Sequence, residues 1–233
     1  MFRRMFELMR KDLEQNATPL GLFFGLGLGL PALLALLKGG SESADFYVGA
    51  VMPIIVFGGG LVLPGMFIGD EKAKGTFRFL AMLPISPALM VCAKFLLIVG
   101  VVLAVALISL VAMPWVFVQV GLGLPPISWV VALWMVTAGL LSVAVSASLF
   151  FALNNKLALQ LAYLVILLVA FAPIGVMSAL EARGAATAVE AALSRAPVVA
   201  GALMLAVALV AVGIVFSANT MKWKDWTDLG VER

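Results

Sequence analysis

Six long apolar stretches constrain the fold of this chain more than any other feature of its sequence. They cover residues 19–37, 47–68, 89–117, 129–153, 157–177 and 198–216. About 18 to 20 consecutive apolar residues are enough for a helix to cross the hydrocarbon core of a bilayer. The sequence therefore predicts an all-α integral membrane protein, in which residues 1–233 form a single transmembrane domain of six helical spans.

The composition agrees with this prediction and excludes several classes of function. Hydrophobic residues make up 64% of the chain and charged residues 12%, against about 45–50% and about 25% in soluble domains. The absence of histidine excludes histidine-ligated metal sites and Ser-His-Asp hydrolysis. The lone Cys92 cannot form an internal disulfide, and no GxxxxGK[ST] phosphate loop occurs. We therefore expect a chain that is not an enzyme and that holds no metal or cofactor.

The basic residues between the spans predict the orientation of the chain. Twelve of the 15 Lys and Arg residues lie on one side of the predicted spans, and the other side carries only Lys38, Arg183 and Arg195. Cytoplasmic segments of membrane proteins carry such an excess of Lys and Arg. We therefore expect both termini in the cytoplasm, and we attribute the positive net charge to membrane orientation rather than to nucleic-acid binding.

Two segments that flank the spans are expected to contact the membrane surface. Residues 1–16 predict an amphipathic interfacial helix, because five apolar residues recur at helical spacing. In the C-terminal tail, Trp223 and Trp226 stand beside lysines, as interfacial anchors do. The Ala-rich residues 178–197 could form a short helix in the outer leaflet or a simple surface helix. The apolar residues of the N-terminal helix are Phe2, Met5, Phe6, Met9 and Leu13.

Small residues within the spans predict close contacts between helices. Such residues, repeated every four positions, allow helix backbones to approach closely in a membrane. They could pack helices within one chain, or form a surface between two subunits or the wall of a translocation path. Three consecutive glycines at 58–60, with Pro53 and Pro64, predict an irregular second span. The four-residue repeats are Gly21, Gly25 and Gly29 on the first span, and Ser142 and Ser146 on the fourth.

Between the second and third spans, the segment 70–86 (DEKAKGTFRFLAMLPIS) holds five charges. Lys74 is placed to pair with Asp70 at i,i+4 and with Glu71 at i,i+3. Gly75 suits the end of a helix, and Thr76 can begin a short helix over residues 77–83 that Pro84 ends. Ser86 followed by a proline predicts the start of the third span.

The short helix predicted at 77–83 is apolar around most of its circumference, and Arg78 is its one charge. A helix of two turns is not stable alone in water. It must therefore be buried in the headgroup region, against its own bundle, or in a groove of another protein. The residues by themselves leave membrane-edge packing and partner docking equally open.

This segment resembles the one between the second and third spans of ABC type-2 exporter permeases. In that family an acidic residue precedes a Gly-Thr pair, and apolar residues, a proline and a lysine entering the next span follow. The similarity extends to the layout, with a cytoplasmic amphipathic N-terminal helix and six spans. The matching positions are Glu71, Gly75, Thr76, Pro84 and Lys94.

The resemblance implies a permease subunit whose short helix is a coupling helix. A separate cytoplasmic ATP-binding cassette ATPase would bind ATP and Mg and would drive this helix. A second permease chain, identical or homologous, would complete a pore that exports a peptide-, lipid- or drug-like substrate from a bacterial or archaeal cell across its cytoplasmic membrane. The residues expected to contact the ATPase are Glu71, Lys74, Gly75, Thr76, Phe77, Arg78, Phe79, Leu80 and Leu83.

Two other classes of function are weighed against this one. The first is a membrane protein that works without ATP, such as a self-protection (immunity) factor or a secondary transporter. Spans that hold no ionisable residue besides Lys94, Cys92 and tyrosines argue against proton-coupled transport. The second is a membrane-embedded enzyme, for which Asp70, Glu71 and the pair at 154–155 form no recognised catalytic constellation.

Overall fold

The computed structural model describes residues 2–22, 24–25, 29, 33, 52–74, 85–112, 115, 118, 129–165 and 191–223. These residues are helical, with short turns and no strand, which confirms the all-α class. Three helices are long and apolar enough to cross a membrane: Pro87–Val111, Trp129–Ala152 and Ala196–Met221. They correspond to the third, fourth and sixth predicted spans. The first, second and fifth predicted spans lie partly outside the described residues.

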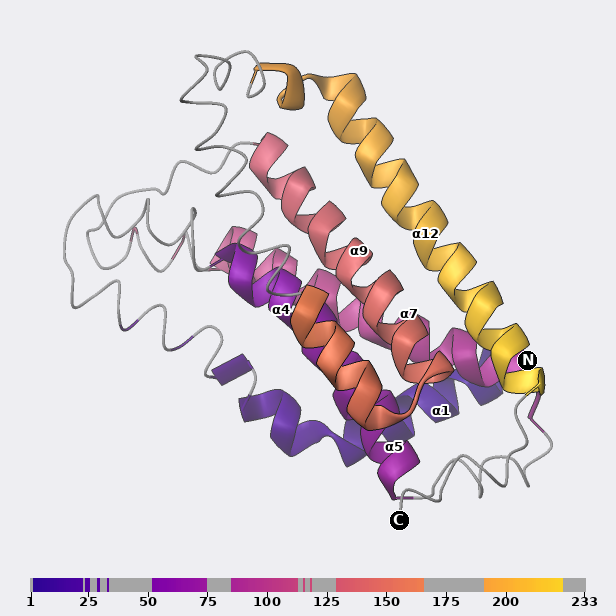
Figure 1. Ribbon diagram of the computed structural model, residues 1–233. Helices are drawn as coiled ribbons and strands as arrows, with labels where there is room; N and C mark the ends of the chain where they lie inside the picture. Colours follow the sequence, from indigo (N-terminus) through magenta and orange to yellow (C-terminus); the bar gives the residue numbers. More distant parts are fainter. Residues whose placement is uncertain are drawn as a thin grey trace.

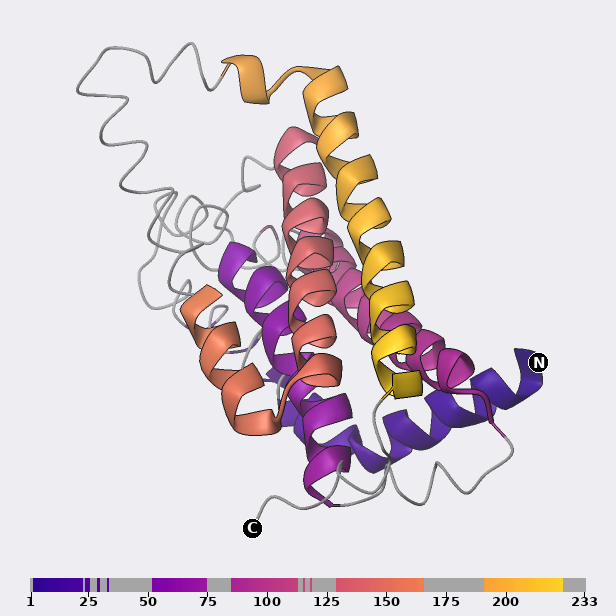
Figure 2. The same cartoon turned by 45° about the vertical axis from the view of Figure 1, so that its right-hand side comes forward.

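The helices form one bundle with an additional helix across its end (Figures 1 and 2). Helix α9 (Trp129–Ala152) is flanked by α4 (Met52–Pro64) and α12 (Ala196–Trp223), and α7 (Pro87–Leu107) contacts all three. Helix α1 (Phe2–Gln15) packs against α7 where that helix begins. The predicted N-terminal helix is therefore present. It lies across the end of the bundle, and its side chains contact the bundle.

Helix α4 continues through a π-helical turn, η2 (Gly65–Gly69), into the short helix α5 (Asp70–Ala73). The second span is therefore irregular, as predicted. Residues 58–60 are regular α-helix, and the departure from α-geometry comes just after Pro64. Proline has no backbone N–H to donate to the carbonyl four residues earlier, here that of Gly60. Ser146 Oγ of α9 lies 2.7 Å from this carbonyl and 2.6 Å from Ser142 O of its own helix, so its one hydroxyl proton is shared between the two carbonyls.

The start of the third span agrees with its prediction. Ser86 Oγ accepts a hydrogen bond from Leu89 N at 3.3 Å, and Pro87 is the first helical residue. The regular part of this helix ends at Leu107 and is followed by a π-helical segment, η3 (Ile108–Ala112). Helix α12 continues seven residues past the predicted end of the sixth span, to Trp223.

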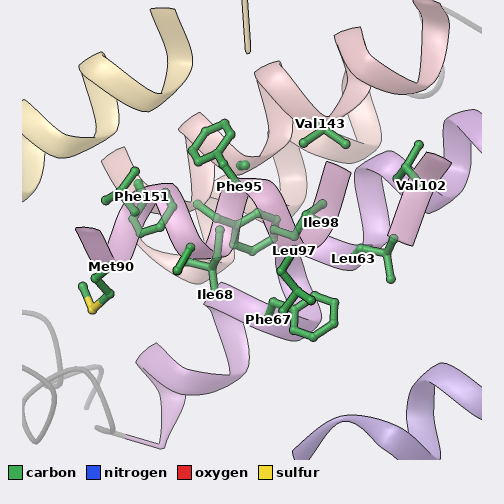
Figure 3. Packing of buried hydrophobic residues seen from close by; sticks show 14 of the residues in the cluster. Leu63, Phe67, Ile68, Met90, Phe95, Leu97, Ile98, Val102, Val143 and Phe151 are labelled. Carbon is green, nitrogen blue, oxygen red and sulfur yellow. The ribbon is translucent and has the colours of Figure 1, made fainter. Parts of the chain in front are cut away.

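The apolar core lies between α4, η2, α7 and α9 (Figure 3). Its largest fully buried side chains include Phe67, Phe95 and Phe151. The rings of Phe95 and Phe151 are stacked with their centroids 6.0 Å apart. This core fixes the first turns of α7 against the last turns of α4 and α9, and the charged residues described next lie at the same end.

Candidate functional site

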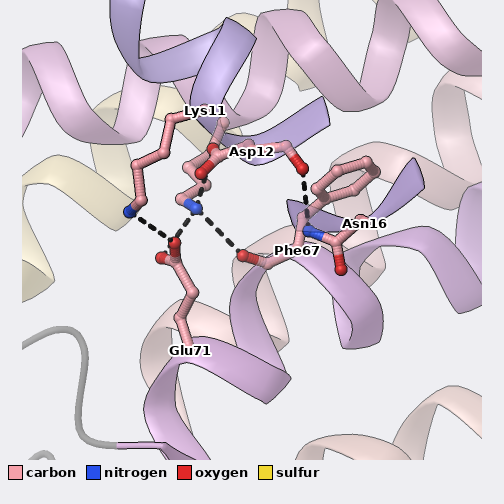
Figure 4. A network of polar contacts seen from close by, with 6 residues as sticks. Lys11, Asp12, Asn16, Phe67 and Glu71 are labelled. Carbon is pink, nitrogen blue, oxygen red and sulfur yellow. Dashed lines mark hydrogen bonds and ion pairs between the residues drawn. The ribbon is translucent and has the colours of Figure 1, made fainter. Parts of the chain in front are cut away.

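A cluster of four charged residues joins three helices at the end of the bundle that α1 crosses (Figure 4). Lys94 of α7 is at its centre, with its Nζ 2.7 Å from Glu71 Oε2 and 2.8 Å from Asp12 Oδ2. The same ammonium donates to Phe67 O at 3.0 Å. Lys11 Nζ lies 3.3 Å from Glu71 Oε1. We call Lys11, Asp12, Glu71 and Lys94 the charge cluster.

Three different helices place the members of the charge cluster. Lys94 is on the buried face of α7, two turns after the helix begins at Pro87. Glu71 is in α5, the continuation of α4 beyond its π-helical turn. Asp12 is on the face of α1 that carries the buried Leu8. The cluster therefore connects the end of the second predicted span, the start of the third, and the N-terminal helix.

The cluster is almost completely shielded from solvent. Side-chain exposure is 3% for Lys94, 3% for Asp12 and 8% for Glu71, whereas Lys11 keeps 34%. A charge at such depth is retained only when it is paired and hydrogen-bonded, because desolvation costs several kcal/mol per ion. Two carboxylates and a carbonyl surround the one fully buried ammonium, so removing Lys94 would leave Asp12 and Glu71 without their shared cation.

The geometry also sets the protonation of Asp12. Burial raises the pKa of Asp12 to about 6 from 3.8, and the negative charge of Glu71 acts in the same direction. Lys94 and Lys11 oppose this shift by favouring the ionised carboxyl. Because desolvation outweighs these attractions, Asp12 holds a proton in a pH range where a solvated aspartate is ionised.

A second set of polar contacts ties the segment 65–74 to the end of α9. Lys72 is 6% exposed, and its Nζ donates to the carbonyls of Phe150 and, at 2.9 Å, of Leu153. Asn155 Nδ2 donates to Gly69 O at 2.7 Å. The last carbonyls of a helix have no partner within the helix and favour a cation. Lys72 therefore serves as the cap of α9 from a different helix.

The structure confirms only one of the two ion pairs predicted in the segment 70–86. Lys74 pairs with Asp70 at 3.8 Å, as predicted, and both side chains are exposed. Glu71 pairs with Lys94 and Lys11 rather than with Lys74, because its side chain points into the bundle. The remaining expected ATPase contacts, Gly75, Thr76, Phe77, Arg78, Phe79, Leu80 and Leu83, lie outside the described residues.

The predicted small-residue repeats also behave differently from each other. Ser142 Oγ donates to Gly139 O at 2.7 Å, and Ser146 Oγ bonds to Gly60 O, so this pair packs helices within the chain. A Cβ added to Gly60 would lie 1.8 Å from Ser142 Oγ. A Cβ added to the first-span glycines would meet nothing within 4 Å. Packing between permease chains through Gly21, Gly25 and Gly29 stays a prediction.

Helix α1 has three faces rather than the predicted two. Leu8 and Asp12 are buried against the bundle, and Met5 and Met9 pack beside them. Phe6 and Leu13 are exposed, at 67% and 41%. The third face is charged and carries two exposed i,i+4 ion pairs, Arg3 with Glu7 at 3.0 Å and Arg10 with Glu14 at 2.7 Å. An exposed apolar strip beside a charged face suits a helix at a membrane surface.

Sequence reasoning missed three residues of this end of the bundle, Lys11, Asp12 and Lys72. The sequence could have indicated Asp12, because it falls four residues after Leu8 and three after Met9, on an otherwise apolar face of the predicted helix. Lys72 carried no such signal, because its partners are backbone carbonyls about 80 positions away.

Comparisons with known proteins leave the functional argument to the structure itself. No family model, no curated protein and no solved structure matches this chain. Within the residues that the structure describes, no group of three or more Cys, Asp or Glu residues could hold a metal ion.

Proposed function

We propose that this chain is the membrane-spanning permease subunit of an ATP-driven exporter, moved by a separate ATP-binding cassette ATPase. The observation that supports the proposal is the ion pair between Glu71 and Lys94, at 2.7 Å. These two residues match the acidic and basic positions on either side of the segment that resembles the coupling region of ABC type-2 exporter permeases.

The position of this ion pair suits transmission of a movement. The described residues end at Lys74 and resume at Ile85 on the two sides of the segment 75–84. Glu71 and Lys94 join these two sides directly, and Lys72 ties the first side to the end of α9. A force applied to residues 75–84 would therefore be transmitted to α4, α7 and α9 together.

The predicted orientation supports the same proposal. Helix α5, which precedes residues 75–84, lies at the end of the bundle that carries the charge cluster and α1. Positive-inside reasoning puts this end in the cytoplasm, where an ATPase subunit would be. The proposed complex contains a second permease chain, and its ATPase subunits bind ATP and Mg. The substrate is proposed to be peptide-, lipid- or drug-like.

Co-purification from native membranes tests this proposal. We expect the tagged chain to retain a soluble protein with ATP-binding motifs. Phe77→Asp and Phe79→Asp should weaken this association at least about tenfold, because buried aromatics dominate such docking sites. Phe77→Leu, which keeps an apolar side chain, is the matched control. All three variants should insert into the membrane equally.

Two results would count against the proposal. The first is a chain that is isolated from gently solubilised native membranes with no ATPase bound. The second is transport, or protection against a membrane-active compound, that persists after ATP depletion. Either result would favour the ATP-independent class of membrane protein.

A further inference from the structure

We propose that the docking of α1 on the bundle is controlled by a proton, taken up at Asp12 and favouring the docked helix. This inference does not depend on the exporter proposal, since it concerns contacts within the chain. It follows from the number and arrangement of charges in the charge cluster, and from which helix carries each of them.

The buried part of the cluster has one negative charge too many. Asp12 and Glu71 both contact the single ammonium of Lys94, at 2.8 and 2.7 Å. Two carboxylates that share one cation repel each other, and a proton on one of them relieves this repulsion. The remaining cation, Lys11, is one-third exposed and therefore partly screened by solvent.

The partners of the two carboxylates indicate which of them takes the proton. Glu71 is paired with both Lys94 and Lys11, whereas Asp12 is paired with Lys94. Among the described residues packed around Asp12, the charged groups are Lys94 of α7, Glu71 of α5 and Lys11 of its own helix. With the smaller share of positive charge, Asp12 is the proton acceptor.

The direction of the effect follows from proton linkage. Asp12 has a pKa of about 6 when α1 is docked, against 3.8 when its carboxyl is solvated. The docked state therefore binds a proton more tightly, so acid favours docking and rising pH weakens it. Between pH 7.5 and pH 5 the docking equilibrium should shift about tenfold toward the docked state, because each pKa unit corresponds to a factor of ten.

Distances between spin labels can measure this equilibrium in the full-length chain in lipid nanodiscs. Labels would be attached to cysteines at Glu7 of α1 and at Lys156, both exposed and outside the charge cluster, in a Cys92→Ser background. Leu8→Ala would be added to weaken docking into the measurable range, since Leu8 is the buried apolar contact of α1. The docked helix gives one narrow distance, and the undocked helix gives a broad distribution.

We expect the ratio of narrow to broad populations to rise about tenfold from pH 7.5 to pH 5, as linkage requires. Asp12→Asn, which imitates the protonated side chain, should make the ratio high and independent of pH. Glu14→Gln, on the exposed face of the same helix, should respond to pH as the parent does.

A second variant covers the case in which Asp12→Asn does not fold. Glu71→Gln removes the carboxylate that competes for Lys94, so it lowers the pKa of Asp12 and moves the midpoint of the pH response to lower pH. The proposal is overturned if the two populations are unchanged between pH 7.5 and pH 5. It is also overturned if acid undocks α1, or if Glu14→Gln abolishes the response.

Discussion

The charged end of the bundle and the middle of the α4–α9 contact are held together by different physical means. At the charged end, the buried ammonium groups of Lys72 and Lys94 reach across helices to carboxylates and backbone carbonyls. In the middle, Gly60 and Ser146 bring two backbones together without any charge. The charged end favours the arrangement of helices in which its buried charges are paired, because an unpaired buried charge is costly. The middle defines how closely the helices meet, because glycine leaves room for the neighbouring helix.

Substituting Lys94, the central lysine of the charge cluster, should destabilise the charged end of the bundle. Lys94→Met keeps the length of the side chain but removes the cation that Asp12 and Glu71 share. We expect a loss of about 3–5 kcal/mol in the free energy of unfolding, because removing one partner leaves buried charges uncompensated. The measurement is a denaturant titration in mixed micelles, followed by circular dichroism.

The matched control for this substitution is Lys74→Met. Lys74 forms an exposed i,i+4 pair with Asp70, and such pairs contribute about 0.3–0.5 kcal/mol. Equal effects of Lys94→Met and Lys74→Met would show that the buried cluster does not hold the bundle together.

Adding a single methyl group should disrupt the middle of the α4–α9 contact. In Gly60→Ala the new Cβ would lie 1.8 Å from Ser142 Oγ and 2.9 Å from Gly139 O, so α4 and α9 must separate. Overpacking of this kind costs about 1–3 kcal/mol, which the same titration can measure. Gly58→Ala in the same helix is the control, since its Cβ meets nothing within 4 Å. An equal or smaller loss for Gly60→Ala than for Gly58→Ala would contradict the close approach.

Removing one hydroxyl group should have the smallest effect, and it tests the hydrogen bond between α4 and α9. Ser146→Ala leaves the carbonyl of Gly60 without its cross-helix donor, and Pro64 cannot replace that donor. We expect a loss of about 0.6 kcal/mol, the average for hydrogen bonds between membrane helices. Ser148→Ala, which loses only a bond to Ala144 O within its own helix, should have less effect. The reverse order would show that the Gly60 carbonyl finds another partner.

Hydropathy predicted the helices well and their environments poorly. Spans 129–153 and 198–216 were expected from their apolar length, and both are helical in the structure. Yet the helices Pro87–Val111 and Ala196–Met221 are about equally apolar, while 56% of the most apolar part of the first is buried in the bundle and only 17% of that of the second. A transmembrane helix is apolar toward lipid and toward protein alike, so hydropathy does not distinguish the two faces.

Local signals at the candidate site were read correctly where they concerned neighbours in sequence. The cap of α7 by Ser86 and the pair of Asp70 with Lys74 are both present. Glu71 was assigned to Lys74 by the same reasoning, and it pairs with Lys94 instead. Burial offers Glu71 a partner 23 positions away, and an ion pair shielded from water is stronger than an exposed one.

The sequence by itself determined the helical class, the membrane character and the density of charge between the second and third predicted spans. Apolar length, residue composition and capping residues are local properties, and these conclusions need nothing more. Only the tertiary structure decided that Asp12, Glu71 and Lys94 share one site. Their meeting depends on the packing of three helices, and no local pattern fixes which carboxylates a buried ammonium will find when those helices assemble.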